Sequence, residues 1–319
     1  MEVEWREMRN LGQRFQINLF SKMEVDVIYY CIYTFLILFT RGLLAMFHKF
    51  FFEFHDAKIR VNRIGDLSKV AINSISLYPP HDFKEMTKDI KKKLQEWAKT
   101  YHCADFIQND PVQFPHRYRQ KQDIEISGLL TAIMSFGNRK QILKKADELH
   151  DCMGTSPYQY VLSRRWEKDF PAEEKRSFYR MLSYADFYSY FERLYAAYSR
   201  FESLEEALQV YSGLPIEKLC AFLEVSSRSP QKKLNMFLRW MIRKGSEVDF
   251  GIWESFDCRD LIIPLDTHVC RVARLLELTE TETFSLKNAQ RITAALAEVF
   301  PDDPCYGDFA LFGYGVNNK

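Results

Sequence analysis

The spacing of apolar residues predicts helices along the chain from residue 86 onward. In the stretch DIEISGLLTAIM, residues 123–134, isoleucine and leucine recur at three- and four-residue intervals and so share one face of a helix. Residues 187–201 and 203–214 repeat this spacing, and no stretch shows the convincing apolar–polar alternation of a half-buried strand. The pattern therefore predicts an all-α protein of roughly ten helices.

Three of these helices have recognisable first residues. Ser229 followed by Pro230 predicts a helix start, with the serine hydroxyl as N-cap and proline at the first helical position. Pro264 ends any preceding helix, and Asp266 comes directly before the amphipathic stretch THVCRVARLL, so we expect Asp266 to cap that helix. Ser285 is expected to cap a later one.

Residues 1–85 have a different pattern. Between Val27 and Phe47 only Arg41 interrupts an apolar run, whose length is near the roughly 20 residues that span a bilayer. Three interpretations fit this segment: a membrane anchor, a buried helix, or sequence translated upstream of the true start codon. We favour the third, because Met86 opens a normal amphipathic helix and is a sensible first residue.

Composition and charge narrow the function classes only slightly. The formal net charge is +1, so any basic surface for nucleic acid would have to be local. The seven cysteines lie far apart and form neither a CxxC motif nor a cluster with histidine. They are expected to be buried free thiols in a reducing compartment, which argues against disulfides, zinc and iron–sulfur clusters. We expect no metal and no cofactor.

The helix that follows Pro230 begins with two lysines, Lys232 and Lys233. Positive charge there opposes the helix dipole and costs stability. An anion docked on the helix N-terminus, or a need for a reactive amine, would justify them. The simpler alternative is a solvated basic face that includes Arg239. The inward face of this helix is expected to consist of Leu234, Phe237, Leu238 and Met241.

The segment PLDTHVCRVARLLEL around Asp266 resembles the catalytic segment of the helix-hairpin-helix (HhH-GPD) DNA glycosylase superfamily. Further motifs resemble, in order, those of the DUF2400 family, which is related to these glycosylases. They are NDPVQFPHRY, KQDIEISGLL, KKLNMFLRWMIR, VDFGIW, IIPLDTHV and DFALFGYGV, between about residue 88 and residue 316. The resemblance implies that residues 86–319 form a two-lobed helical HhH-GPD-like domain pair with a DNA-binding cleft between the lobes.

The resemblance also implies a mechanism. The target base is flipped out of the duplex, because its glycosidic bond is out of reach inside the stack. Asp266 would stabilise the oxocarbenium-like transition state and activate the nucleophile. Read alone, Asp266 is only a helix cap. The superfamily's lysine, which can form a Schiff base, corresponds to Lys232 or Lys233; we favour Lys232, which lies on the basic strip of its helix.

Other residues are carried over as contacts to the substrate. The loop in MSFGNRK, which resembles the one that fills the gap left by the flipped base, supplies Ser135, Asn138 and Arg139. The remaining candidates for binding DNA or the base are Ser227, Ser229, Arg239, Trp240, Trp253, His268, Phe312 and Tyr314. For the aromatic residues a place in the core is the simpler alternative, and for His268 it is a local hydrogen bond.

Three departures from the superfamily pattern stand out. The hairpin SSRSPQKK contains no glycine, whereas glycines usually let its backbone approach a phosphate. Lys232 precedes Asp266 by 34 positions, a long spacing caused by the insert at residues 244–261. The cysteine cluster of many relatives is absent, so we expect no iron–sulfur cluster.

The leading hypothesis is an enzyme: a monomeric DNA glycosylase, with or without a lyase step, acting on a damaged or mismatched base in double-stranded DNA. It is expected in the cytoplasm, associated with the nucleoid. The alternative is a non-catalytic nucleic-acid-binding protein of the same fold. A membrane-tethered protein, the third hypothesis, depends only on the run from Val27 to Phe47.

Overall fold

The computed structural model describes residues 86–318. The three interpretations of residues 1–85 concern a segment that lies outside the described residues. Within residues 86–318, no helix combines the length and the apolar character that crossing a membrane requires.

Helices dominate the described part of the chain, which confirms the predicted all-α class. The α-helices are α4 (Lys88–Tyr101), α5 (Asp105–Gln108), α6 (Lys121–Met134), α7 (Arg139–Met153), α8 (Pro157–Leu162), α9 (Trp166–Asp169), α10 (Tyr184–Tyr198), α11 (Leu204–Ala207), α12 (Pro215–Leu223), α13 (Lys232–Ile242), α14 (Thr267–Leu275), α15 (Leu286–Ala297) and α16 (Gly307–Asn317). Short 3-10 turns lie at Pro111–Gln113, Pro115–Arg117, Leu208–Val210, Cys258–Asp260 and Pro304–Tyr306.

One small antiparallel hairpin was not predicted. It joins β1 (Ser177–Tyr179) to β2 (Leu182–Ser183), with Tyr179 opposite Leu182. Its strands are too short for any apolar–polar alternation to be visible in the sequence.

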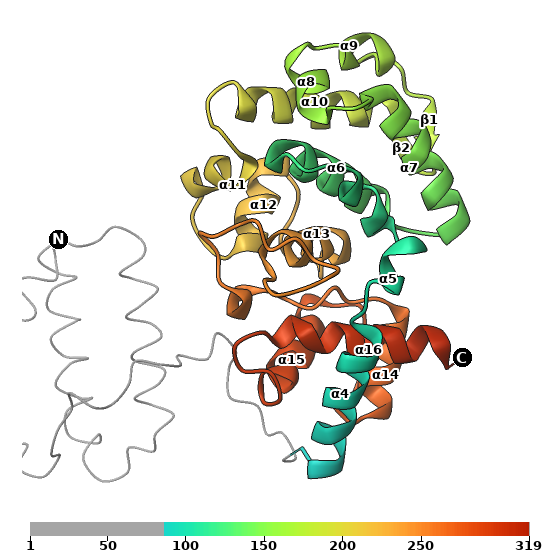
Figure 1. Ribbon diagram of the computed structural model, residues 1–319, viewed down its shortest axis with the longest axis vertical. Coiled ribbons are helices and arrows are strands. Elements are labelled where there is room, and N and C mark those ends of the chain that lie inside the picture. Colours follow the sequence, from blue (N-terminus) through green and yellow to red (C-terminus); the bar gives the residue numbers. More distant parts are fainter. Residues whose placement is uncertain (1–85, 319) are drawn as a thin grey trace, which may run out of the picture. The chain divides into compact units, whose positions relative to one another are not determined.

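The described helices form two groups (Figure 1). The first group runs from α6 to α13, and the second contains α4 together with α14, α15 and α16. The second group thus joins a helix from the start of the described chain to three from its end. Helix α6 is the centre of the first group, since every residue from Asp123 to Met134 is buried. Its neighbour α13 buries the four residues predicted for its inward face.

The predicted start of α13 is wrong by two residues. The helix begins at Lys232, and Ser229 is not its cap. Gln231 occupies the N-cap position in the left-handed region, with φ of 42°, and its side-chain Nε2 donates to the Ser226 carbonyl at 2.6 Å. Asn235 in the first turn of the helix also contacts this loop: its Nδ2 donates to the Pro230 carbonyl at 2.9 Å. Pro230 therefore lies in the loop and not in the helix.

The other two predicted caps are confirmed. Asp266 Oδ1 accepts a hydrogen bond from the Val269 N–H at 3.0 Å, at the start of α14. Ser285 Oγ accepts one from the Asn288 N–H at 3.2 Å, at the start of α15. Asp266 is therefore placed by its own capping bond as well as by the helix that it starts.

The carboxylate of Glu125 on α6 ties the insert at residues 244–261 to the first group. This side chain is 0% exposed and accepts four hydrogen bonds. The donors are Tyr198 Oη at 2.8 Å, Trp253 Nε1 at 2.6 Å, and the backbone N–H groups of Leu204 at 2.9 Å and Glu205 at 3.3 Å. The insert is thereby held by a buried polar cluster as well as by apolar packing.

Candidate functional site

A cavity of about 710 Å³ is lined by both helix groups. The first group contributes the loop between α6 and α7 and the start of α13, and the second contributes the start of α14 and part of α16. Most of the residues predicted from the sequence lie on its wall: Ser135, Arg139, Lys232, Lys233, Arg239, Asp266, His268 and Phe312. The cavity therefore gathers segments that lie far apart in the chain.

Asp266 reaches the cavity from the start of α14. The side chain is half-buried, and Oδ1 is occupied by the capping bond to the Val269 N–H. For the second oxygen, Oδ2, the described residues provide no hydrogen-bond donor and no ion pair. One oxygen thus fixes the carboxylate, and the other is available to a ligand.

Lys232 and Lys233 are the first two residues of α13 and line the same cavity. Neither forms an ion pair with any carboxylate among residues 86–318. Lys233 Nζ lies 4.6 Å from the centre of the Phe136 ring, and Lys232 Nζ lies 3.8 Å from Met236 Sδ. Burial, together with the charge of Lys232, lowers the pKa of Lys233. The surroundings of Lys233 thus make its neutral form easier to reach than that of a lysine in water.

The start of α13 has a further property. Among residues 86–318 no side chain caps it, because Gln231 directs its amide back to the Ser226 carbonyl. The first N–H groups of the helix therefore remain without a side-chain partner next to two lysines. Such a terminus favours an anion.

Two acids on the cavity wall were missed from the sequence, Asp110 and Asp308. Asp110 Oδ1 accepts the Val112 N–H at 3.1 Å, and burial raises the pKa of this carboxyl group. Asp308 is 4% exposed and its Oδ2 accepts from Arg239 Nη1, whereas its buried Oδ1 has no partner among the described residues. Burial and the nearby Asp266 raise the pKa of Asp308 to about 6. Both acids belong to motifs that carry the family resemblance, which was the available signal.

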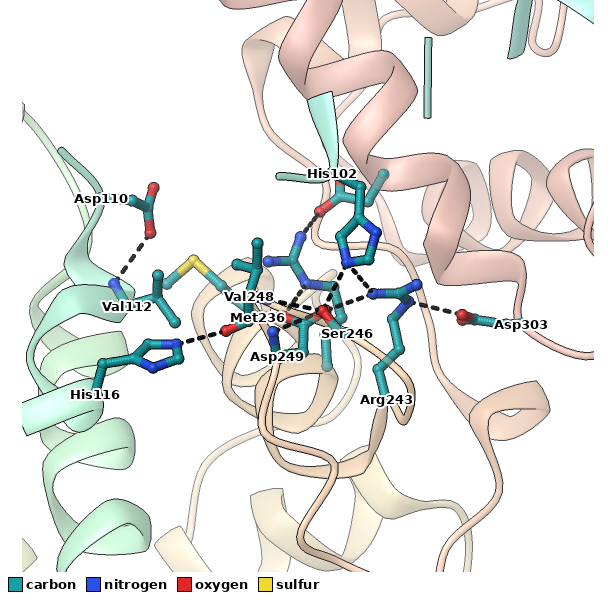
Figure 2. A network of polar contacts seen from close by, with 12 residues as sticks. His102, Asp110, Val112, His116, Met236, Arg243, Ser246, Val248, Asp249 and Asp303 are labelled. Carbon is teal, nitrogen blue, oxygen red and sulfur yellow. Dashed lines mark hydrogen bonds and ion pairs between the residues drawn. The ribbon is translucent and has the colours of Figure 1, made fainter. Parts of the chain in front are cut away.

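Arg239 lines the cavity and is itself held by two carboxylates. Its Nε donates to Asp249 Oδ1 at 3.2 Å, and its Nη1 donates to Asp308. Arg243, one turn later, donates to Asp249 Oδ2 at 2.9 Å and to Asp303 Oδ2 at 2.7 Å (Figure 2). These pairs join α13 of the first group to α16 and the segment before it in the second. The wall behind the cavity is therefore a buried ion-pair network.

Histidine side chains extend this network at its edges. His102, the residue after α4, lies 2.7 Å through Nε2 from Ser246 Oγ, and His116 Nε2 lies 2.8 Å from the Val248 carbonyl (Figure 2). His268 in the cavity has Nδ1 2.8 Å from the Gly315 carbonyl. Because a carbonyl can only accept, the proton of His268 lies on Nδ1 when the ring is neutral.

Three of the predicted residues lie in loops outside the cavity wall. Asn138 caps α7, with Oδ1 accepting from the N–H groups of Lys140 at 3.0 Å and Gln141 at 3.3 Å. Ser227 is half-buried and Ser229 is exposed, both in the loop before α13. Next to Asn138, Gly137 lines the cavity with φ of 97°, a conformation that favours glycine.

Three predicted aromatic residues also lie away from the cavity wall. Trp240 and Trp253 are both 0% exposed, and Trp253 donates to Glu125. Tyr314 stacks on Trp97 with 3.8 Å between ring centres. Phe312 is the predicted aromatic residue that lines the cavity. Core packing thus accounts for the positions of both tryptophans.

The described residues contain no group of three histidine, cysteine, aspartate or glutamate side chains arranged to hold a metal ion. The six cysteines among them are free thiols.

Comparison with known proteins identifies a family but does not indicate an activity. The family model described as "Protein of unknown function (DUF2400)" matches residues 110–218 and 216–317. No curated protein and no solved structure matches the chain.

Proposed function

The chain belongs to the DUF2400 family, and from this premise and the geometry of its cavity we propose that it is a DNA base-excision glycosylase. Its fold would be that of the HhH-GPD superfamily, with α12, the loop at residues 224–231 and α13 as the hairpin unit. Its substrate would be a damaged or mismatched base in double-stranded DNA.

One observation carries the proposal: the starts of α13 and α14 meet at a single cavity. One brings two lysines without acidic partners, and the other brings Asp266 with one oxygen free. The cavity volume of about 710 Å³ falls within the range of about 300–1,000 Å³ that is usual for small-molecule sites. A flipped nucleobase with part of its sugar is a ligand of that size class.

Asp266 is suited to the bond-breaking step. As the glycosidic bond lengthens, positive charge develops on the sugar ring, and a fixed carboxylate stabilises it. The bond from the Val269 N–H holds Asp266 in place before the reaction begins. Little reorganisation is then needed in the transition state.

A lyase step would use one of the two lysines. The neutral amine attacks C1′ of the sugar, and the base departs with the electrons of the glycosidic bond and takes up one amine proton. The C1′–O4′ bond then breaks, the second amine proton passes to O4′, and the opened sugar is left as a Schiff base on the lysine. Position on the basic strip favours Lys232, whereas the lowered pKa favours Lys233. Both lysines therefore need to be tested.

The uncapped start of α13 would bind a DNA phosphate. In the superfamily, glycines bring the hairpin backbone to the phosphate, but this loop has none. Here Glu224 and Gln231 adopt the left-handed conformation, with φ of 55° and 42°, in place of glycines. The chain thus makes the turn at some conformational cost, and the helix N-terminus stays open.

The decisive experiment combines excision with borohydride trapping. Duplexes carrying oxidised, deaminated or abasic sites are incubated with the full chain, and cleavage and trapped adducts are measured. Asp266→Asn should lower excision by about 100-fold or more, because asparagine still caps the helix but lacks the charge. Of Lys232→Gln and Lys233→Gln, the one that abolishes trapping identifies the nucleophile.

Asp257 provides the matched control. It also caps a helical turn, through Oδ1 and the Arg259 N–H at 2.8 Å, but it does not line the cavity. Asp257→Asn should leave excision unchanged. Absence of cleavage and of adducts across the whole panel, or an unaltered rate in Asp266→Asn, contradicts the proposal.

The glycine-free hairpin favours a second candidate, a non-catalytic nucleic-acid-binding protein of the same fold. Its signature would be tight, salt-sensitive duplex binding without turnover, unchanged by Asp266→Asn.

A further inference from the structure

Asp308 is buried in the cavity wall with an unfilled acceptor. Its Oδ1 has no hydrogen-bond partner in the described part of the chain, although the side chain is only 4% exposed. An unpaired buried acceptor destabilises the fold, and buried polar groups are rarely left in that state. Asp308 is a lining residue of the cavity, and no group among residues 86–318 fills this acceptor.

Charge balance gives the same indication. Two arginines, Arg239 and Arg243, are paired with three carboxylates: Asp249, Asp303 and Asp308. With all three carboxylates ionised, the network therefore carries one negative charge more than its two arginines neutralise. Asp249 already bonds both arginines, so holding Arg239 in place does not by itself require Asp308. Of the three carboxylates, Asp308 is the one that lines the cavity.

A second buried acid extends the acceptor surface. Asp110 is 8% exposed, lines the same cavity and accepts a hydrogen bond through Oδ1 alone, from the Val112 N–H. Both acids feel the charges of Arg239 and Lys232. A ligand atom that reaches this part of the cavity meets carboxylate oxygens, and it must donate hydrogen bonds to be held there.

We propose that Asp308, with Asp110 as the second acceptor, selects bases that carry an exocyclic amino group over the corresponding bases that carry a carbonyl oxygen at that position. An amino group brings two N–H donors and no competing acceptor. A carbonyl oxygen at the same place would face Asp308 Oδ1 with like partial charge and would leave both oxygens unpaired. The inference depends on the proposed function, since it names the class of base that the same cavity takes.

The size of the effect follows from the loss of a bond to a charged acceptor. Such a bond contributes about 1.5–3 kcal/mol, which corresponds to about 10- to 150-fold in affinity. We expect the amino member of a matched pair to bind at least about 10-fold more tightly than the oxo member.

The test measures binding, so it does not require turnover. Duplexes carry 2′-fluoroarabino nucleotides, whose glycosidic bond resists cleavage, with bases in matched amino and oxo pairs. Suitable pairs are 5-hydroxycytosine with 5-hydroxyuracil, and mismatched adenine with mismatched hypoxanthine. Dissociation constants are measured for the full chain and for Asp308→Asn. The variant can donate from its amide to a carbonyl oxygen, so its preference should vanish or reverse.

Asp249→Asn is the matched control. Asp249 is as deeply buried and also bonds Arg239, but it does not line the cavity. It should keep the amino preference, whatever happens to stability. If Asp308→Asn fails to fold, by circular dichroism, Asp110→Asn takes its place and should reduce the preference as well.

The outcomes separate the inference from the proposed function. An amino preference without excision of any base in the panel leaves the inference standing and refutes the enzyme. Excision without a difference inside either pair refutes the inference and leaves the enzyme. Equal binding within both pairs, or no binding to either member, overturns the role given to Asp308.

Discussion

Two buried carboxylates, Glu125 and Asp308, are treated very differently by the surrounding chain. Glu125 lies in the first helix group and accepts four hydrogen bonds, from two side chains and two backbone N–H groups. Asp308 lies in the second group: Oδ2 accepts from one arginine, and Oδ1 has no partner within residues 86–318. Both are almost inaccessible, at 0% and 4% exposure.

The comparison indicates what each acid is for. A carboxylate buried for stability collects donors from every segment around it, as Glu125 does from α10, α11 and the insert. A carboxylate buried beside a cavity can keep an acceptor for a molecule that is not part of the chain. The number of unfilled acceptor positions, more than burial itself, distinguishes the two.

The largest expected effect comes from removing Glu125. Glu125→Leu leaves four buried donors without an acceptor and should lower the free energy of unfolding by about 4 kcal/mol or more. Asp308→Asn removes one ion pair whose arginine keeps Asp249, and should cost about 1 kcal/mol or less. Urea denaturation of the two variants measures the difference. Equal losses in the two variants would contradict the different roles of Glu125 and Asp308.

The second effect is a pH dependence that belongs to Asp308. Its pKa, raised from 3.8 to about 6, means that the folded state holds this proton more tightly than the unfolded chain does. Its contribution to stability therefore falls as pH rises from about 4 to about 6 and is constant above that range. Relative to Asp308→Asn, the wild type should lose about 2 kcal/mol between pH 4 and pH 7.

Urea denaturation of both proteins at intervals across this pH range tests the sign as well as the size. Charges that face Asp308 and would shift the midpoint are Arg239 and Lys232 of α13 and Asp266 of α14. A difference between the two proteins that is flat with pH, or that grows in the opposite direction, would show that Asp308 does not carry this proton.

The smallest effect tests a single donor in the Glu125 cluster. Trp253→Phe keeps most of the buried ring and removes the N–H that bonds Glu125 Oε1 at 2.6 Å. Three donors remain, so the loss should be about 1–2 kcal/mol in thermal or urea unfolding. Base preference should not change, because Trp253 does not line the cavity. A changed base preference would indicate that Trp253 influences substrate binding.

The sequence predicted the parts of the fold that depend on local rules. The inward face of α13 and the cap at Asp266 follow from spacing and from hydrogen-bonding chemistry within one turn. The start of α13 was misplaced because Gln231 adopts a left-handed conformation, which glycine ordinarily signals and glutamine does not. The hairpin β1–β2 was not predicted because its strands, of three and two residues, are too short to show any periodicity.

The site was predicted only where a motif carried it. Asp266 and the two lysines come from segments with a recognisable pattern, and they do line one cavity. Asp308 was missed because a lone acid in DFALFGYGV reads as a solvated or capping residue. Its burial in an ion pair depends on Arg239, which lies 69 positions away in the chain. Likewise, the contact of Trp253 with Glu125 spans 128 positions, which no local pattern encodes.

The ion pairs behind the cavity also limit how the cavity can be filled. Arg239–Asp308 and Arg243–Asp303 are ion pairs that cross from the first helix group to the second. A motion that separates the two helix groups would have to break both ion pairs, so wide opening of the cavity is energetically costly. For the proposed reaction, the nucleic acid would therefore have to distort more than the protein. Lesions that already weaken base pairing or stacking would enter the cavity fastest, before the base contacts any carboxylate.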